Sequence, residues 1–384
     1  MQTPTISHGS GATLFDTEGK EYTDLFSANG VAWLGHADPK IGAAVQEQLT
    51  QVWATGRLPT EVARGAASEL EGFLPEGYRF AGFYSTGAEV LEFAARVARR
   101  STARSGLVGF RGSMHGKTML ASYLGWDNGD GLAIPDSARL PYPPEVSEEE
   151  CLSAVRAELS RGAAAAVCFE PMQGCRGGFS PSEGFVKRLR EITSAHGVLL
   201  LFDELLTGLH RTGPRFAFEA AGVSPDMVLI GKSLGNGFPV SALAVREPLE
   251  VRAEMLPGST FAGNPLAAAA VRATLLRMRE YNLATMAREI GEVIESSLSS
   301  TVGRGAVLRG KGAFWVLTMP QGFGTEGFVQ RVYARGVAIG YTGLQVRLLP
   351  PVVIGRDALQ RACDILREEF ESQCGGSRLA AGAN

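Results

Sequence analysis

The chain lacks long apolar runs, basic runs and a charged or apolar leader, and each absence excludes a class of protein. No stretch of 18 or more apolar residues occurs in its 384 residues, so we expect no transmembrane helix and no membrane partner. The first residues form neither a basic nor an apolar segment, so no signal peptide is expected. No Lys/Arg run or basic stripe appears and the net charge is -3, so no nucleic-acid partner is expected.

Cysteine and histidine are also scarce. The five cysteines are odd in number, scattered and without CxxC spacing, and the five histidines include no HExxH. This pattern favours reduced thiols in a cytoplasmic protein over disulfides, and it offers no metal site. The remaining composition is that of an ordinary globular protein, long enough for a large domain with a smaller companion.

The order of elements predicts an α/β fold. Residues 11–35 are typical of a hairpin, and an amphipathic helix should follow from Pro39 to about Trp53, with Asp38 as its N-cap. From about residue 60, helices alternate with short apolar runs at 80–84, 106–110, 164–169, 197–202 and 227–230. Strands without polar alternation are buried on both faces, which indicates a mostly parallel sheet covered by helices.

The domain boundaries follow from this pattern. We expect residues 1–55 to contribute to a small domain, 56–265 to form the large domain and 266–372 to form the rest of the small α+β domain. A helical stretch over 264–281 should link the domains, strands are expected near 313–318, 337–341 and 346–354, and a final helix near 358–371. The small, polar, Gly/Ala-rich residues 373–384 should be a disordered tail.

Three features follow separate predicted strands, at the edge where ligands bind in such sheets. Thr86-Gly87-Ala88 opens a helix, whose free amides attract an anion such as phosphate. Asp203 ends one strand and Lys232 follows another. A lysine and an aspartate so placed can hold pyridoxal phosphate (PLP), the amine by a Schiff base and the carboxylate at the pyridine nitrogen. Taken singly, each has a plainer explanation: a glycine turn, a capping turn and a surface lysine.

The motifs together resemble those of the class III aminotransferases, PLP enzymes of fold type I. The matching segments run in the family's order from about residue 11 to 370: Gly35-His36, 86–89, His115-Gly116, Glu170-Pro171, 203–213, 225–239, 263–265 and 347–351. The resemblance implies a seven-stranded sheet, PLP as cofactor, an amino donor and a carbonyl acceptor as substrates, and a homodimer with shared active sites.

The resemblance also assigns roles to residues. Lys232 and Asp203 would be catalytic. The cofactor would be bound by them and by Thr86, Gly87, Ala88, Met114, His115, Glu170, Leu205, Leu206, Ser259 and Thr260, with Ser259-Thr260 reaching the neighbouring subunit's phosphate. Arg347 and Lys117 would bind the substrate carboxylate.

The pocket departs from the family at four positions. Met114 replaces a stacking aromatic residue, Leu206 a glutamine near the cofactor's 3′-oxygen, Lys117 an arginine, and Cys175 a glutamate that would neutralise Arg347. Two interpretations of these changes are open: neutral drift, or a pocket rebuilt for other PLP chemistry. We therefore expect an aminotransferase, with two alternatives left open. One is a PLP enzyme performing elimination, carbon–carbon bond formation, decarboxylation or aminomutase chemistry; the other is a catalytically silent scaffold.

Overall fold

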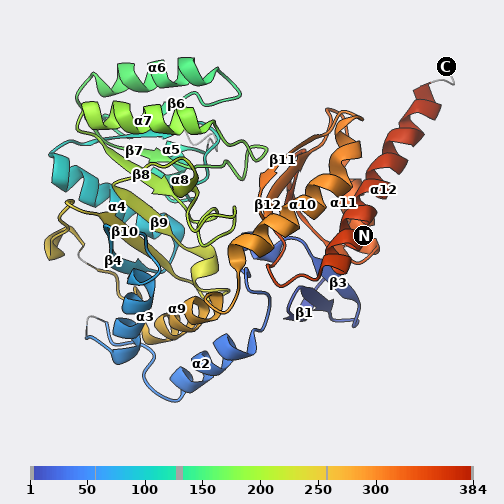
Figure 1. Ribbon diagram of the computed structural model, residues 1–384, viewed down its shortest axis with the longest axis horizontal. Coiled ribbons are helices and arrows are strands. Elements are labelled where there is room, and N and C mark those ends of the chain that lie inside the picture. The colour runs from blue at the N-terminus through green and yellow to red at the C-terminus, as the bar shows by residue number, and fades with distance from the viewer. Residues whose placement is uncertain (1–3, 57, 127–132, 257, 382–384) are drawn as a thin grey trace. The chain divides into compact units, whose positions relative to one another are not determined.

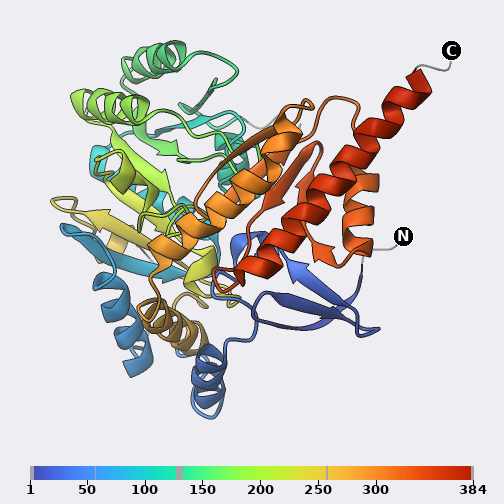
Figure 2. The same cartoon turned by 45° about the vertical axis from the view of Figure 1, so that its right-hand side comes forward.

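The computed structural model describes residues 4–56, 58–126, 133–256 and 258–381, and its chain divides into two compact units. Unit 2 comprises Pro39–Leu209 and Pro214–Tyr281. Unit 1 comprises the segment up to Asp38, the short insertion His210–Gly213, and the chain from Asn282 onward. Figures 1 and 2 show the elements of each unit in two views.

Unit 2 is built on a seven-stranded sheet in the order β4-β10-β9-β8-β7-β5-β6. All neighbours from β9 to β6 run parallel, and β10 is antiparallel to both β4 and β9. The expected α/β class with a mostly parallel sheet is therefore confirmed. The strands are β4 (Tyr78–Tyr84), β5 (Gly106–Phe110), β6 (Ala138–Leu140), β7 (Ala164–Phe169), β8 (Leu199–Asp203), β9 (Met227–Ile230) and β10 (Ser241–Arg246).

Helices cover both faces of this sheet. Phe169 and Phe202, paired across β7 and β8, pack their rings 5.0 Å apart on one face, where Phe185 of α7 joins them. Alternation along the strands sends Cys168 and Leu201 to the other face, into a core shared with α4. The helices of unit 2 are α2 (Pro39–Leu49), α3 (Glu61–Glu71), α4 (Gly87–Thr102), α5 (Met119–Leu124), α6 (Glu148–Leu159), α7 (Glu183–Ala195), α8 (Ala217–Ala220), η1 (Lys232–Leu234), η2 (Ala253–Met255) and α9 (Pro265–Met278).

Unit 1 contains two four-stranded sheets, β1-β2-β3-β13 and β11-β12-β15-β14. Helices α10 and α12 pack against each other, side by side in Figure 2. Its strands are β1 (Ile6–Ser10), β2 (Thr13–Asp16), β3 (Glu21–Asp24), β11 (Val307–Lys311), β12 (Phe314–Thr318), β13 (Val337–Ala338), β14 (Gly340–Thr342) and β15 (Gln345–Leu348). Its helices are α1 (Ser27–Gly30), α10 (Leu283–Val302), α11 (Thr325–Ala334) and α12 (Arg356–Ala381).

The insertion His210–Gly213 is fastened into unit 1 by Arg211. The guanidinium is fully buried, donates to the carbonyl oxygens of Gly30 and Pro350 at 2.9 Å each, and lies 4.0 Å from the ring centre of Trp33. Burial lowers the pKa of Arg211 to about 9. The carbonyl dipoles and the aromatic face stabilise this charge, and the Asp24 carboxylate opposes the fall in pKa.

The unit boundaries differ from the expected domains at both ends of the large domain. Helices α2 and α9, expected outside residues 56–265, belong to unit 2 because α9 packs on both α2 and α3. An ion pair of 2.7 Å between Lys40 and Glu280 joins the start of α2 to the segment after α9.

The expected disordered tail is also corrected, because α12 continues to Ala381. Phe370 is fully buried, Glu369 pairs with Arg331 at 2.9 Å, and Gln373 bonds Arg331. The last anchored turn gives the helix a template, and adding residues to a formed helix costs far less than starting one. The final part of the expected tail, residues 382–384, lies outside the described residues.

Candidate active site

The first component is the start of α4, which follows the end of β4. Thr86 is the N-cap and its hydroxyl accepts the Glu89 amide at 3.1 Å, while the Glu89 carboxylate accepts the Ser85 amide at 2.7 Å. Ser241 on the adjacent β10 donates to the Thr86 carbonyl at 2.7 Å and fixes the turn from the sheet side. Gly87 and Ala88 occupy the first two helical positions, where amides have no partner within the helix. The sequence predicts an anion cradle at this helix start.

The second component is a buried carboxylate–imidazole pair. Asp203 is only 3% exposed at the end of β8. One carboxylate oxygen accepts a hydrogen bond from Nδ1 of His115 at 2.6 Å, and the other accepts the Leu205 amide at 3.1 Å. Because a carboxylate can only accept, the ring proton of His115 lies on Nδ1. The sequence placed both residues near the cofactor but did not predict that they pair.

The third component is Lys232, directly after β9. It opens the 3-10 turn η1 with φ 44°, a left-handed conformation that is uncommon away from glycine. The preceding Gly231 is extended, with φ -171°. The lysine is half-buried, while its neighbours Ser233 and Leu234 are fully buried. A rare backbone conformation at this residue is held by the packed turn that follows it.

One side chain, Leu205, joins these three components. A Cβ added at Gly87 would lie 2.6 Å from Cδ1 of Leu205, and one added at Gly231 would lie 2.5 Å from Cδ2. The two methyl groups therefore touch the start of α4 and the backbone before Lys232. Leu205 follows Asp203 by two residues, so the anion cradle, the carboxylate and the lysine meet at one place.

The His115 segment closes the group from a fourth direction. Gly116, with φ 142°, lies so close to α4 that an added Cβ would stand 2.6 Å from the Cβ of Ala88. Met114 is half-buried, and its amide donates to Glu170 at 2.9 Å. Glu170 also accepts the Gly174 amide at 3.3 Å, and burial together with Asp203 raises its pKa to about 7.

Glu204 is a buried carboxylate that fixes the chain after β8. The sequence indicated only a turn at this position. It is 1% exposed, accepts the Phe218 amide at 3.0 Å and accepts the Thr207 hydroxyl. These bonds hold the chain after β8 against α8. Burial raises the pKa of Glu204 to about 7. Only its partners reveal this role, and they are 3 and 14 residues away in sequence.

The other expected site residues are spread more widely. Lys117 and Thr260 are exposed, while Leu206, Ser259 and Cys175 are half-buried, all in unit 2. Arg347 lies on β15 of unit 1, with its guanidinium 5.7 Å from the ring centre of Phe26.

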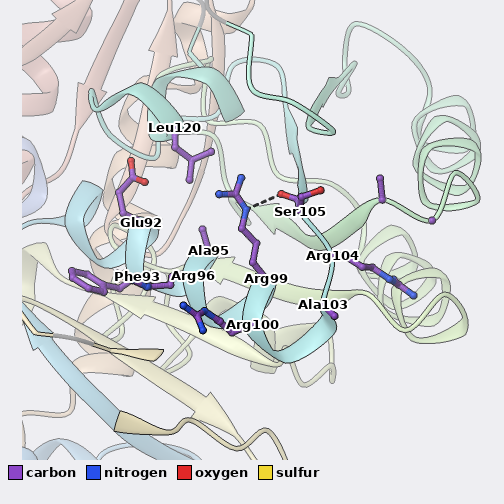
Figure 3. Close-up of a pocket in the computed structure, with 12 residues that line it drawn as sticks. Glu92, Phe93, Ala95, Arg96, Arg99, Arg100, Ala103, Arg104, Ser105 and Leu120 are labelled. Atoms are coloured by element: carbon purple, nitrogen blue, oxygen red, sulfur yellow. Dashed lines mark hydrogen bonds between the residues drawn. The ribbon is translucent and has the colours of Figure 1, made fainter. Parts of the chain in front are cut away.

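A separate cavity of about 860 Å³ lies along α4 (Figure 3). Four arginines line it, Arg96, Arg99, Arg100 and Arg104, but neither Asp203 nor Lys232 does. Arg99 donates to the Ser105 carbonyl at 2.7 Å, and Arg104 donates to the carbonyls of Ala164, His196 and Gly197. Basic residues in a last helical turn also suit the helix dipole. The cavity is separate from the convergent group of Asp203, Lys232 and Gly87.

Within the described ranges, no group of three or more His, Cys, Asp and Glu side chains is arranged to hold a metal ion. Over the same residues, no helix combines the length and apolarity needed to cross a bilayer.

A family model for class III aminotransferases matches residues 2–370. The chain belongs to the class III aminotransferases. Curated relatives include 2-aminoadipate transaminase from Pseudomonas putida, 32% identical with 95% of each chain covered. Acetylornithine aminotransferase from Methanopyrus kandleri is 36% identical, with 93% of this chain and 92% of the relative covered. A transaminase structure from the marine bacterium Virgibacillus has a TM-score of 0.88 at 21% identity, covers 98% of this chain and 94% of that one, and confirms the fold.

The protein is thus a PLP-dependent aminotransferase of fold type I, acting on a small-molecule amino donor and a keto acceptor. The residues present fit this cofactor. Helical amides beside a glycine suit its phosphate, a buried carboxylate suits its ring nitrogen, and a half-buried lysine at the sheet edge suits its aldehyde.

The contact between Gly87 and Leu205 makes a first prediction. Gly87→Ala should force Leu205 against Gly231, lowering the free energy of unfolding by about 1–3 kcal/mol and weakening PLP binding. The double variant with Leu205→Ala should recover much of the cofactor affinity, measured by fluorescence titration. Gly184→Ala, an open position in α7, is the control. Equal PLP affinity in wild type and Gly87→Ala would contradict this packing.

Glu204 makes a prediction about pH. Its pKa is about 7 in the folded protein and about 4.5 ordinarily, so the folded state binds more protons between these values. The contribution of Glu204 to the free energy of unfolding is therefore fully present below about pH 4.5. It is lost as the pH rises to about 7, and the total loss is roughly 3 kcal/mol. Glu204→Gln should flatten the fall in thermal midpoint between pH 5 and 7.5. If the thermal midpoints of the variant and the wild type fell in parallel as the pH rises, the raised pKa of Glu204 would be contradicted.

Proposed function

We propose that Lys232 is the residue that holds PLP covalently and later moves the substrate proton. Bound PLP supplies an electron sink that makes the Cα proton of an amino acid removable and carries the amino group between substrates. The observation that carries the proposal is the meeting of Gly87, Asp203 and Lys232 around Leu205. A lysine Nζ released by the incoming amine is then a base beside the bond that must lose its proton.

The surrounding residues would orient the cofactor ring. Asp203 would keep the ring nitrogen protonated, with His115 fixing the carboxylate through the 2.6 Å bond. Gly87 and Ala88 would bind the phosphate through their amides, helped by Thr86 as the cap. Leu205 and Met114 would provide the apolar surfaces for the ring.

The remaining assignments concern support and substrate choice. Glu170 would fix Met114 through the amide bond of 2.9 Å. Leu206 would face the cofactor oxygen without a hydrogen bond, since leucine has no donor. Arg347 and Lys117 would bind substrate carboxylates, Arg347 as the bidentate partner.

The relatives' names suggest which donors to test. They include a 2-aminoadipate transaminase, acetylornithine aminotransferases and a 5-aminovalerate aminotransferase. We therefore propose an amino acid or ω-amino acid donor that carries a carboxylate. The first screen tests 2-aminoadipate, acetylornithine and 5-aminovalerate as amino donors, each with keto-acid acceptors. A loss of the visible absorbance of the bound cofactor reports amino transfer.

Lys232→Ala tests the central assignment. It should abolish the absorbance of covalently held PLP and reduce turnover at least about 100-fold, because the proton-transfer group is removed. Lys187→Ala, an exposed position on α7, is the matched control and should leave both unchanged. Undiminished multiple turnover by Lys232→Ala would refute the role. Product release without amino transfer would instead favour the redirected PLP chemistry.

We also propose a cytoplasmic homodimer in which Ser259 and Thr260 bind the partner's cofactor phosphate. All five cysteines are free thiols, which suits a reducing compartment, and cell fractionation tests the location. Ser259 and Thr260 lie in a turn away from helix interiors, where hydroxyls can reach outward.

Hybrid dimers test the shared site. Co-expression of Lys232→Ala with the Ser259→Ala/Thr260→Ala double variant should restore activity, because each hybrid contains one site with its lysine and both hydroxyls. Activity of purified hybrids no higher than the mean of the two parents would show that the sites are not shared in this way.

A further inference from the structure

Cys168 lies beneath the carboxylate–imidazole pair and is absent from the assignments above. It belongs to β7, is 1% exposed, and pairs across the sheet with Leu201 of β8. Because Leu201 and Asp203 lie on the same face of β8, the Cys168 side chain reaches the face that carries Asp203. The other β7 side chains are alanine, valine and phenylalanine, so the thiol is the one side chain of this strand that can donate or accept a hydrogen bond.

Among the polar groups of the described residues, the sulfur of Cys168 contacts only His115. Sγ lies 3.6 Å from Nε2 and 3.7 Å from Nδ1. The two N–H directions of an imidazole diverge, so a sulfur nearly equidistant from both nitrogens lies off both axes and makes a weak, adaptable contact. Nδ1 already bonds Asp203, which leaves Cys168 as the one polar neighbour of Nε2 in the described structure.

A buried Nε2 needs a partner whichever way it is protonated. When His115 is charged, the sulfur places its lone pairs beside the positive ring; when it is neutral, Nε2 has a lone pair toward which the thiol hydrogen can turn. Alanine or valine could do neither, and a buried polar atom without a partner is costly. Serine could do both. Cysteine at this position therefore suits an imidazole that must stay oriented in both charge states.

We propose that Cys168 is a positioning residue that serves the Nε2 side of His115 and so fixes the orientation and protonation of the imidazole that holds Asp203. Its relevance to catalysis rests on the proposed role of Asp203 at the cofactor's ring nitrogen. The contact itself belongs to the protein alone, so it can be tested without PLP.

The charges around the ring agree with this role. Three titratable groups face His115: Cys168 and Glu170 from β7 and its end, and Asp203 from β8. Burial alone would lower the pKa of His115, but Cys168 and Asp203 hold it well above its ordinary value. Burial raises the pKa of the Cys168 thiol, so it is neutral near pH 7. Asp203 thus supplies the full charge, and Cys168 contributes through its sulfur.

The test uses histidine nitrogen NMR on cofactor-free protein, with His115 assigned from a His115→Gln sample. Cys168→Val keeps an apolar group of similar size but removes the partner of Nε2. It should lower the His115 titration midpoint by about half a unit or more, with a changed Nε2 shift. Cys168→Ser should restore both. Cys363→Val, a buried thiol in unit 1, is the control and should leave His115 unchanged.

Two results would overturn the proposal. One is a folded Cys168→Val protein whose His115 signals titrate as in wild type, or a serine variant that behaves like the valine variant. The other needs no variant at all: a wild-type His115 midpoint at or below its ordinary value. Failure of the Lys232 experiment would leave these measurements unaffected, so the two hypotheses can fail separately.

Discussion

The active site depends on one aliphatic side chain fitting between two glycines. Leu205 reaches Gly87 with one methyl group and Gly231 with the other, at distances that no Cβ would allow. Its backbone amide also binds Asp203 at 3.1 Å. Three strand ends thereby meet around one side chain. Close packing transmits small displacements, so the start of α4, the acid and the lysine are held in one arrangement.

Beneath this contact the protein buries three carboxylates, and each is stabilised differently. Asp203 has His115 as its partner, Glu170 accepts two backbone amides, and Glu204 accepts an amide and a hydroxyl. The pKa values of Glu170 and Glu204 rise to about 7 because burial disfavours their charged forms. Asp203 alone has a cationic partner. The acid beside the proposed ring nitrogen is thus distinguished from its neighbours by its surroundings and not by its residue type.

Much of the fold was predictable because apolar runs and capping residues are local signals. The runs at 106–110, 164–169 and 227–230 became β5, β7 and β9, and Thr86 and Asn264 cap α4 and α9. Strand β10 was not predicted, although Ser241–Arg246 is mostly apolar, because its antiparallel place between β4 and β9 depends on distant partners. Helix α12 runs past its expected end for a similar reason: the contacts of Phe370 and Glu369 outweigh the weak helix preference of the glycines that follow.

The sequence by itself determined the class of fold and the cofactor, and it predicted which residues would carry the chemistry, because motif order and strand hydrophobicity are written along the chain. Only the tertiary structure decided which side chains meet. The bond between His115 and Asp203 spans 88 residues and the contact between Cys168 and His115 spans 53. Such contacts arise when strands pair side by side, and their partners are fixed by register and burial, which no short stretch of sequence contains.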